Sequence, residues 1–166
     1  MPALYFVNVT MHVLAAMLWF GGMLFLGIVG APLLRALEPP ELRQRLFRDL
    51  GLRFRTVGWW SIAVLIVTGI VNLAYRDLLR WEGGGVLGSL AFWRTPFGHA
   101  LAIKMLAVAV MLTVSAVHDF VIGPAASAAM PGSPESAALR RRAALIARVN
   151  ALIGVIVVVA AVRLAR

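Results

Sequence analysis

Four side chains that can bind metals or carry protons stand in or beside the apolar segments of this 166-residue chain: His12, His99, Lys104 and His118. A charge near the middle of a bilayer costs at least about 2.5–3.5 kcal/mol, so residues of this kind usually have a function. Imidazole ligates iron, and burial favours the neutral amine, which is also a ligand. These residue types therefore predict a metal or haem centre.

His12 and Lys104 are the pair best matched in depth. They lie about nine and seven residues into the first and third apolar segments, which cross a membrane in the same direction. At about 1.5 Å per residue the depths differ by roughly 3 Å, which a lysine side chain spans. By the same count His99 lies about 10 Å shallower than His12, and His118 about 16 Å deeper. We expect His12 and Lys104 on opposite sides of one centre, with His99 and His118 as secondary metal candidates.

The surroundings of this pair favour a large, flat ligand. The helix face that carries His12 also presents two alanines, which leave room for a porphyrin, with an asparagine and a tryptophan. Lys104 shares a stripe with a methionine seven residues on. An asparagine of the second apolar segment falls at a similar level, where it can orient a ligand. The binding candidates around the pair are therefore Asn8, Trp19, Asn72 and Met111.

A second polar group is expected in the inner half of the membrane. It comprises His118, Asp119, Arg148 and Asn150. Three roles are compatible with these residues: a second binding site, a place where haem propionates pair with Arg148, and a satisfied hydrogen-bonded network.

The composition indicates an integral membrane protein. Hydrophobic residues make up 61% of the chain and charged residues 14%, against about 25% in soluble domains. The net charge of +9 comes almost wholly from arginines between apolar runs, where they mark topology and contact lipid headgroups; we therefore expect no nucleic-acid partner. The absence of cysteine excludes disulfides, thiolate metal sites, iron–sulfur clusters and c-type haem.

The apolar segments predict an all-α, integral membrane four-helix bundle that forms a single domain over residues 1–166. The predicted spans are 3–30, 57–75, 97–122 and 143–162, each long enough to cross about 30 Å. In 37–55 the leucines fall on one helix face and the arginines largely on the rest, which predicts an amphipathic interfacial helix between the first two spans. The region 124–142 is expected to be a solvated loop. The connection 76–96, with Trp81, is expected to fold over the mouth of the bundle.

The distribution of arginines predicts the orientation. Ten lie in 35–55 and 124–148, and five lie in 76–96 and the C-terminus. The positive-inside rule places both termini outside, on the periplasmic side of a bacterial-type inner (plasma) membrane.

Three stretches resemble known families. They are WFGG in the first span, RFRTVGWWSIAVLIVTGIVNL leading through the second, and TPFGHALAIKMLAVAVMLTVSAVHD in the third. They are similar to the CopD (copper resistance D) domain and to the related HemJ-type four-span proteins. The likeness covers about residues 5–122, and the fourth span matches only as a generic helix. Thr95, Phe97, Gly98 and Lys104 carry the more specific part.

The HemJ-type resemblance implies haem b, with His12 and Lys104 as the matching residues, and links that centre to protoporphyrinogen oxidation. The chain departs from this pattern in two places. After WFGG it reads MLFLGIVGAPLL instead of a Tyr-Leu-Pro-Arg-Leu run, and His99 precedes Lys104 by five residues instead of two. These departures leave an oxidoreductase activity open. The CopD resemblance implies copper handling on histidine and methionine ligands, which suit Cu(I).

Three functions follow, in this order. The first is a membrane haem b protein that passes electrons to or from a lipid-soluble partner such as quinone. The second is copper transport or copper resistance. The third is a cofactor-free accessory subunit that anchors a larger complex through its arginine-rich face, which leaves a homo- or hetero-oligomer open.

Overall fold

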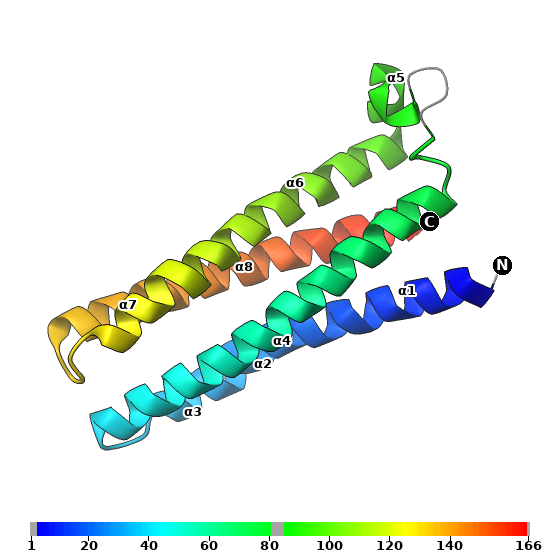
Figure 1. Cartoon of the computed structure of the whole chain (residues 1–166). Coiled ribbons are helices and arrows are strands. Elements are labelled where there is room, and N and C mark those ends of the chain that lie inside the picture. The colour runs from blue at the N-terminus through cyan, green and yellow to red at the C-terminus, as the bar shows by residue number, and fades with distance from the viewer. Residues whose placement is uncertain (1–2, 81–84, 166) are drawn as a thin grey trace.

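The computed structural model describes residues 3–80 and 85–165, and within them the chain is helical with no β-strand (Figure 1). Four continuous helical rods are long and apolar enough to cross a membrane. They run over Ala3–Arg35, Pro40–Tyr75, Pro96–Ala128 and Pro134–Ala165. The predicted all-α membrane bundle is confirmed, and the chain is a multi-pass membrane protein.

Two of the rods change their helical winding along their length. π-Helical turns at Met17–Gly21 and Leu26–Gly30 divide the first rod, and one at His118–Ile122 divides the third. The resulting α-helices of these rods are α1 (Ala3–Ala16), α2 (Gly22–Phe25), α3 (Ala31–Arg35), α6 (Pro96–Val117) and α7 (Gly123–Ala128). The other two rods are single helices, α4 (Pro40–Tyr75) and α8 (Pro134–Ala165).

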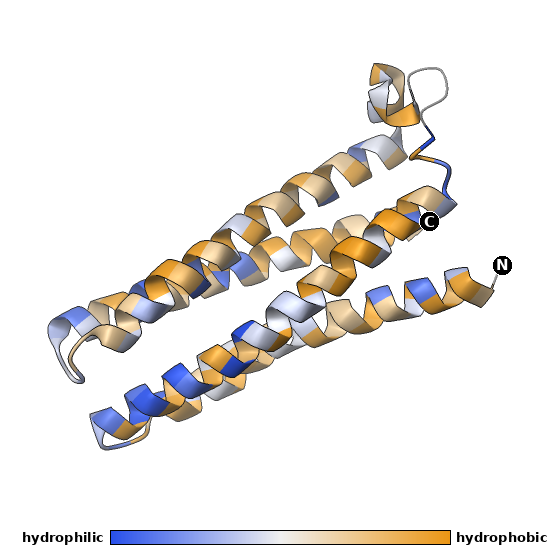
Figure 2. Cartoon of the chain, in the orientation of Figure 1, coloured by the Kyte–Doolittle hydropathy of each residue, from blue (hydrophilic) through white to orange (hydrophobic). Residues whose placement is uncertain are grey.

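The rods form two antiparallel pairs. The first rod packs along α4, and α6 packs along α8. Both chain termini lie at one end of the bundle, here called the terminal end (Figure 1). At the other end Gln44 of α4 donates to the carbonyls of Ser127 (3.1 Å) and Ala129 (2.8 Å) and so ties the two pairs together. Hydrophilic residues on α4 and α8 gather toward this second, arginine-rich end (Figure 2).

The start of α6 explains the Thr-Pro-Phe-Gly sequence at its N-terminus. Thr95 caps the helix by accepting a hydrogen bond from the Gly98 amide at 3.0 Å, and Pro96 occupies the first turn, where its missing N–H costs nothing. A Cβ on Gly98 would collide with the carbonyl of Phe92. The glycine therefore lets the short helix α5 (Leu90–Trp93) sit directly against α6. Residues 81–84 of this connection, including Trp81, lie outside the described residues.

The amphipathic segment is not a separate interfacial helix, which corrects the sequence-based expectation. From Pro40 onward it is the first half of α4, which runs unbroken for 36 residues. No proline interrupts this stretch, and Phe54 packs over Gly22 of the first rod, so the segment follows the bundle axis. At 1.5 Å per residue α4 is about 54 Å long, well beyond the roughly 30 Å of hydrocarbon. Its arginine-bearing half continues the bundle past that layer.

The predicted loop over 124–142 is also wrong for most of its length. The third rod continues to Ala128 and α8 begins at Pro134, so only a tight turn separates them. Alanine and serine favoured a loop by composition, but alanine is the best helix former and extends both helices here.

The outer surface of the bundle is apolar, as a lipid environment requires. Trp60, Leu106 and Leu152 are each at least two-thirds exposed. The buried core is small and centres on Trp19, Ile62 and Met111. Close approach at glycines supplements it: Phe20 packs on Gly154 and links the first rod to α8.

Gly154→Val is expected to destabilise the bundle by about 1–3 kcal/mol, because overpacking forces side chains out of their preferred positions. A Cβ at this position would lie 2.7 Å from the Phe20 ring. Thermal unfolding in detergent measures the effect. Gly51→Val is the matched control, since a Cβ at Gly51 of α4 meets no atom within 4 Å. Equal melting temperatures for the two variants would contradict the contact.

Candidate functional site

His12 is held between α1 and α4 by a hydrogen bond that fixes its tautomer. Its Nδ1 lies 2.7 Å from the Thr68 hydroxyl oxygen. That hydroxyl donates its single hydrogen to the Val64 carbonyl, 2.6 Å away, and can therefore only accept from His12. Nδ1 must then carry the imidazole proton. Nε2 is left with its lone pair, the state needed to ligate a metal.

Asn8 and Asn72 extend this polar contact along the same two helices. The Asn8 amide donates to the Asn72 side-chain oxygen at 2.9 Å and to the Thr68 carbonyl at 3.1 Å. Three residues singled out from the sequence thus come together with Thr68, which was not singled out. Its signal was its position four residues before Asn72, on the same face of one helix.

A glycine of the facing helix lies beside the imidazole. A Cβ on Gly69 of α4 would lie 3.6 Å from the His12 ring. A larger side chain at this position would restrict the space beside the ring.

Lys104 lies half-buried on α6, in the other helix pair. Arg76 follows the end of α4 and is exposed. The Arg76 guanidinium lies 5.2 Å from the centre of the Phe97 ring and donates to the Leu164 carbonyl at 3.2 Å. Phe97 precedes Lys104 by seven residues, two turns on the same helix face. A positively charged region therefore lies at the terminal end of this face.

Trp19 and Met111 belong to the packed centre of the bundle. Their exposed fractions are 7% and 4%, and they share one core cluster with Ile62 of α4. The structure thus places them in the core, between the two helix pairs.

The inner polar group divides into two parts. His118 and Asp119 form a contact of 2.9 Å, and the Trp59 indole donates to the same carboxylate at 3.0 Å. Asn150 turns instead toward Ser115 of α6, 2.8 Å away. Arg148 is exposed, and among the described residues it forms no hydrogen bond with either part. The expectation of one four-residue cluster is therefore corrected.

His99 is exposed near the terminal end of α6. Within residues 3–80 and 85–165 no three histidine, aspartate or glutamate side chains come together. A metal in this part of the chain would need ligands of other types, namely lysine, methionine or an amide.

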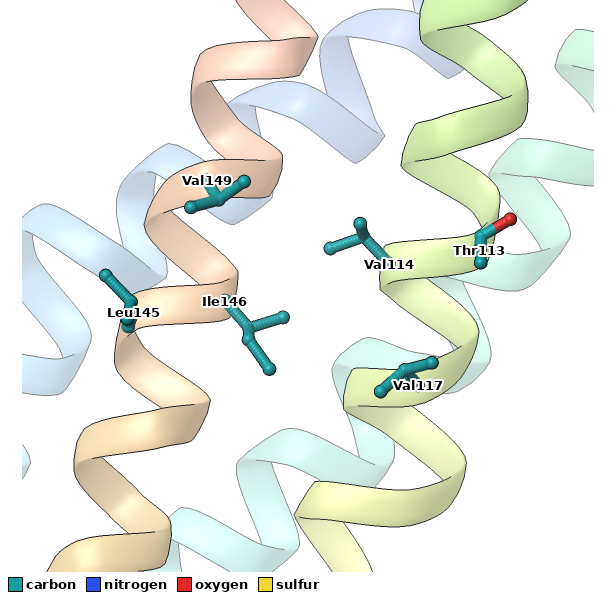
Figure 3. A pocket seen from close by; sticks show the side chains of 6 residues that line it. All are labelled: Thr113, Val114, Val117, Leu145, Ile146 and Val149. Carbon is teal, nitrogen blue, oxygen red and sulfur yellow. The ribbon is translucent and has the colours of Figure 1, made fainter.

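An apolar hollow opens between α6 and α8 (Figure 3). Its lining residues are Thr113, Val114, Val117, Leu145, Ile146 and Val149. The Thr113 hydroxyl already donates to the Ala109 carbonyl at 3.0 Å. The hollow thus presents methyl groups, which suit a lipid chain and provide no catalytic chemistry.

These features define a four-span helical membrane protein with buried polar residues between and within two helix pairs. The chain belongs to the CopD family: the sequence model of "Copper resistance protein D" matches residues 48–164. The match includes Lys104, His118 and the fourth rod, which the sequence resemblance treated as a generic helix, and it begins after His12. The family prediction is confirmed.

A protein of Aquifex aeolicus (strain VF5), described only as uncharacterized, is 44% identical over 63 residues. This similarity covers 37% of the chain and 43% of the relative, so the chain matches less than half of that relative's length. No solved structure matches the chain significantly.

Trp59 is expected to stabilise the fold through its bond to the Asp119 carboxylate. Hydrogen bonds to charged groups contribute about 1.5–3 kcal/mol, and partial exposure of this pair lowers the expected value to about 1 kcal/mol. A double-mutant cycle of Trp59→Phe and Asp119→Ala, followed by unfolding in detergent, measures it. Trp60→Phe is the control because that side chain is 72% exposed. A coupling energy near zero would show that the contact adds nothing.

Proposed function

We propose that this CopD-family protein binds haem b between its two helix pairs and passes electrons to or from a lipid-soluble partner such as quinone. His12 and Lys104 are the proposed axial ligands. The observation that carries the proposal is the 2.7 Å contact of His12 Nδ1 with the Thr68 hydroxyl, which leaves Nε2 for another partner.

The residues present fit this group by their donor chemistry. A histidine oriented through its second nitrogen is the usual arrangement of a metal-binding imidazole. Lys104 would supply an amine from the opposite helix pair, where it lies half-buried on α6. Gly69 places no side chain against the imidazole. Haem bound there would supply one-electron chemistry, and the protein would set its ligands and its dielectric surroundings.

Arg76 replaces Arg148 as the proposed partner of the haem carboxylates. It lies over Phe97, on the helix face that carries Lys104. Arg148 belongs to the other half of the bundle and is exposed. Carboxylates at the terminal end would meet Arg76 without crossing hydrocarbon, where a charge is costly.

We further propose an inner (plasma) membrane location with both termini outside. Both termini lie at the same end, and the opposite end carries the arginine-rich parts of α4 and α8 (Figures 1 and 2). This arrangement agrees with the positive-inside rule.

Copper transport or copper resistance is the second candidate function. The family's description favours it. Methionine thioethers and imidazole are suitable ligands for Cu(I), and Met111 is among the most deeply buried side chains of the core.

Absorbance spectra of the purified protein, oxidised and reduced with dithionite, test the first function. The wild type is expected to show a Soret band and sharp α and β bands. His12→Ala and Lys104→Ala should each lose or shift these bands, because each removes an axial ligand. Thr68→Val should retain haem with a shifted reduction potential, because His12 loses the acceptor that fixes its tautomer.

His99→Ala is the control, since that side chain is exposed at the terminal end. Protein that stays colourless after expression with sufficient haem would overturn the haem proposal. Metal analysis would then separate copper handling from a cofactor-free subunit.

A further inference from the structure

A shallow hollow on the surface of the bundle joins its two helix pairs. Arg55, Thr56, Trp59 and Trp60 of α4 line it together with Phe120 of the third rod, and its volume is about 360 Å³. Trp60 and Phe120 are 72% and 58% exposed, so the hollow opens toward the surroundings of the bundle. It therefore offers one cation and three aromatic rings to a ligand that approaches from outside.

Arg55 is held in this hollow by contacts that leave its charge without an opposite partner. Its Nη1 donates to the backbone carbonyl of Asp119 at 3.1 Å, and its guanidinium lies 5.5 Å from the centre of the Phe120 ring. Among the described residues it forms no ion pair with a carboxylate. A guanidinium has five N–H donors, and the contact with Asp119 occupies only part of them. Arg55 thus has both charge and donors available for an anion.

The carboxylate of Asp119 is engaged by other side chains. Its Oδ2 accepts from the Trp59 indole at 3.0 Å, and its Oδ1 lies 2.9 Å from His118 Nδ1. The Trp59 ring in turn packs on Phe120, with 5.6 Å between the ring centres. Asp119 is not among the residues that line the hollow. These contacts therefore hold the aromatic wall in place and keep this negative charge out of the lining.

The depth of the hollow matches the lipid headgroups. Arg55 lies two residues before the predicted second span 57–75, which is about 3 Å along the helix axis. Tryptophan is enriched at this level of membrane proteins. The hydrophilic half of α4 continues beyond it toward the arginine-rich end (Figure 2). Basic pockets between membrane-spanning helices are known to bind the headgroups of anionic lipids.

The backbone beside the hollow is irregular as well. Phe120 belongs to the π-helical turn His118–Ile122, which interrupts the third rod. Single π-helical turns within α-helices occur frequently at functional sites. The local change of winding thus coincides with the one part of this rod that faces the hollow.

We propose that this hollow binds the phosphate group of one anionic phospholipid, in the leaflet at the arginine-rich end of the bundle. Arg55 binds the phosphate oxygens, because a planar guanidinium matches their geometry. The rings of Trp59, Trp60 and Phe120 contact the apolar part of the lipid next to the headgroup. Since α4 and the third rod belong to different helix pairs, the bound lipid contacts both pairs. The site depends neither on haem nor on copper.

Native mass spectrometry of the full-length protein tests this site by counting the lipids that remain bound after release from detergent. The wild type is expected to retain one phosphatidylglycerol more strongly than phosphatidylcholine. Arg55→Gln should weaken phosphatidylglycerol binding about five- to tenfold, because it removes one cation at an anionic surface and its paired donors. Arg55→Lys keeps the charge but loses the paired donors, so its binding should be intermediate.

Arg53→Gln is the matched control, because Arg53 is exposed on the same helix and does not line the hollow. Trp60→Leu is the second test variant. It leaves the bond between Arg55 and the Asp119 carbonyl in place and should also weaken binding. Circular dichroism checks that each variant is folded.

Three outcomes would overturn the proposal. Unchanged phosphatidylglycerol binding in both Arg55→Gln and Trp60→Leu would place the lipid elsewhere. A wild type that binds inorganic phosphate as tightly as phosphatidylglycerol would identify a site for the free anion. A lipid-free dimer that dissociates in Trp60→Leu would assign this surface to a second copy of the chain.

Discussion

The scarcity of polar partners in hydrocarbon is the constraint on which this structure depends. Each helix pair is joined by polar contacts that are at least partly buried: His12 with Thr68 and Asn8 with Asn72 between α1 and α4, and Ser115 with Asn150 between α6 and α8. Lipid tails are as apolar as leucine, so burial of apolar side chains cannot by itself select helix partners in a membrane. Hydrogen bonds and close approach at small residues select them. The two pairs therefore satisfy most of their polar groups internally and meet through a small apolar core.

The sequence predicted the fold well because its signal was strong. Four long apolar runs can only be helices in a bilayer, where the backbone must satisfy its own hydrogen bonds. The segment 37–55 was predicted less well. Its amphipathic pattern indicates a helix but does not show whether that helix bends at the membrane surface. The helix continues straight into the second span because no proline follows Pro40 before Tyr75 and because Phe54 packs on Gly22.

The depth of the candidate residues in the membrane could be predicted from the sequence, whereas the direction in which each side chain points was harder to predict. The sequence placed Asn8 on the helix face of His12 and Asn72 at a similar level, and two hydrogen bonds from Asn8 join that helix to Thr68 and Asn72 of α4. Thr68 was not predicted, because its one signal was its position four residues before Asn72 on the same face of α4. Arg148 and Asn150 are two residues apart, about 200° around a helix, so they face opposite sides. A similar depth in the membrane therefore did not place Arg148 and Asn150 in one cluster.

Part of the unmet polar capacity of the described residues lies in the core of the bundle, at Asn150, and the buried Ser136 hydroxyl at the start of α8 also has no partner there. Within the pairs, His12 is hydrogen-bonded to Thr68, and Asn150 is hydrogen-bonded to Ser115. What remains is one end of the Asn150 amide, which has no partner among the described residues. The haem centre proposed at His12 lies at another level, nearer the terminal end. A ligand bound between the two pairs would bridge them and add contacts at their interface. Binding of such a ligand should therefore stabilise the assembled bundle in addition to supplying chemistry, since any species that binds only the folded state raises its stability.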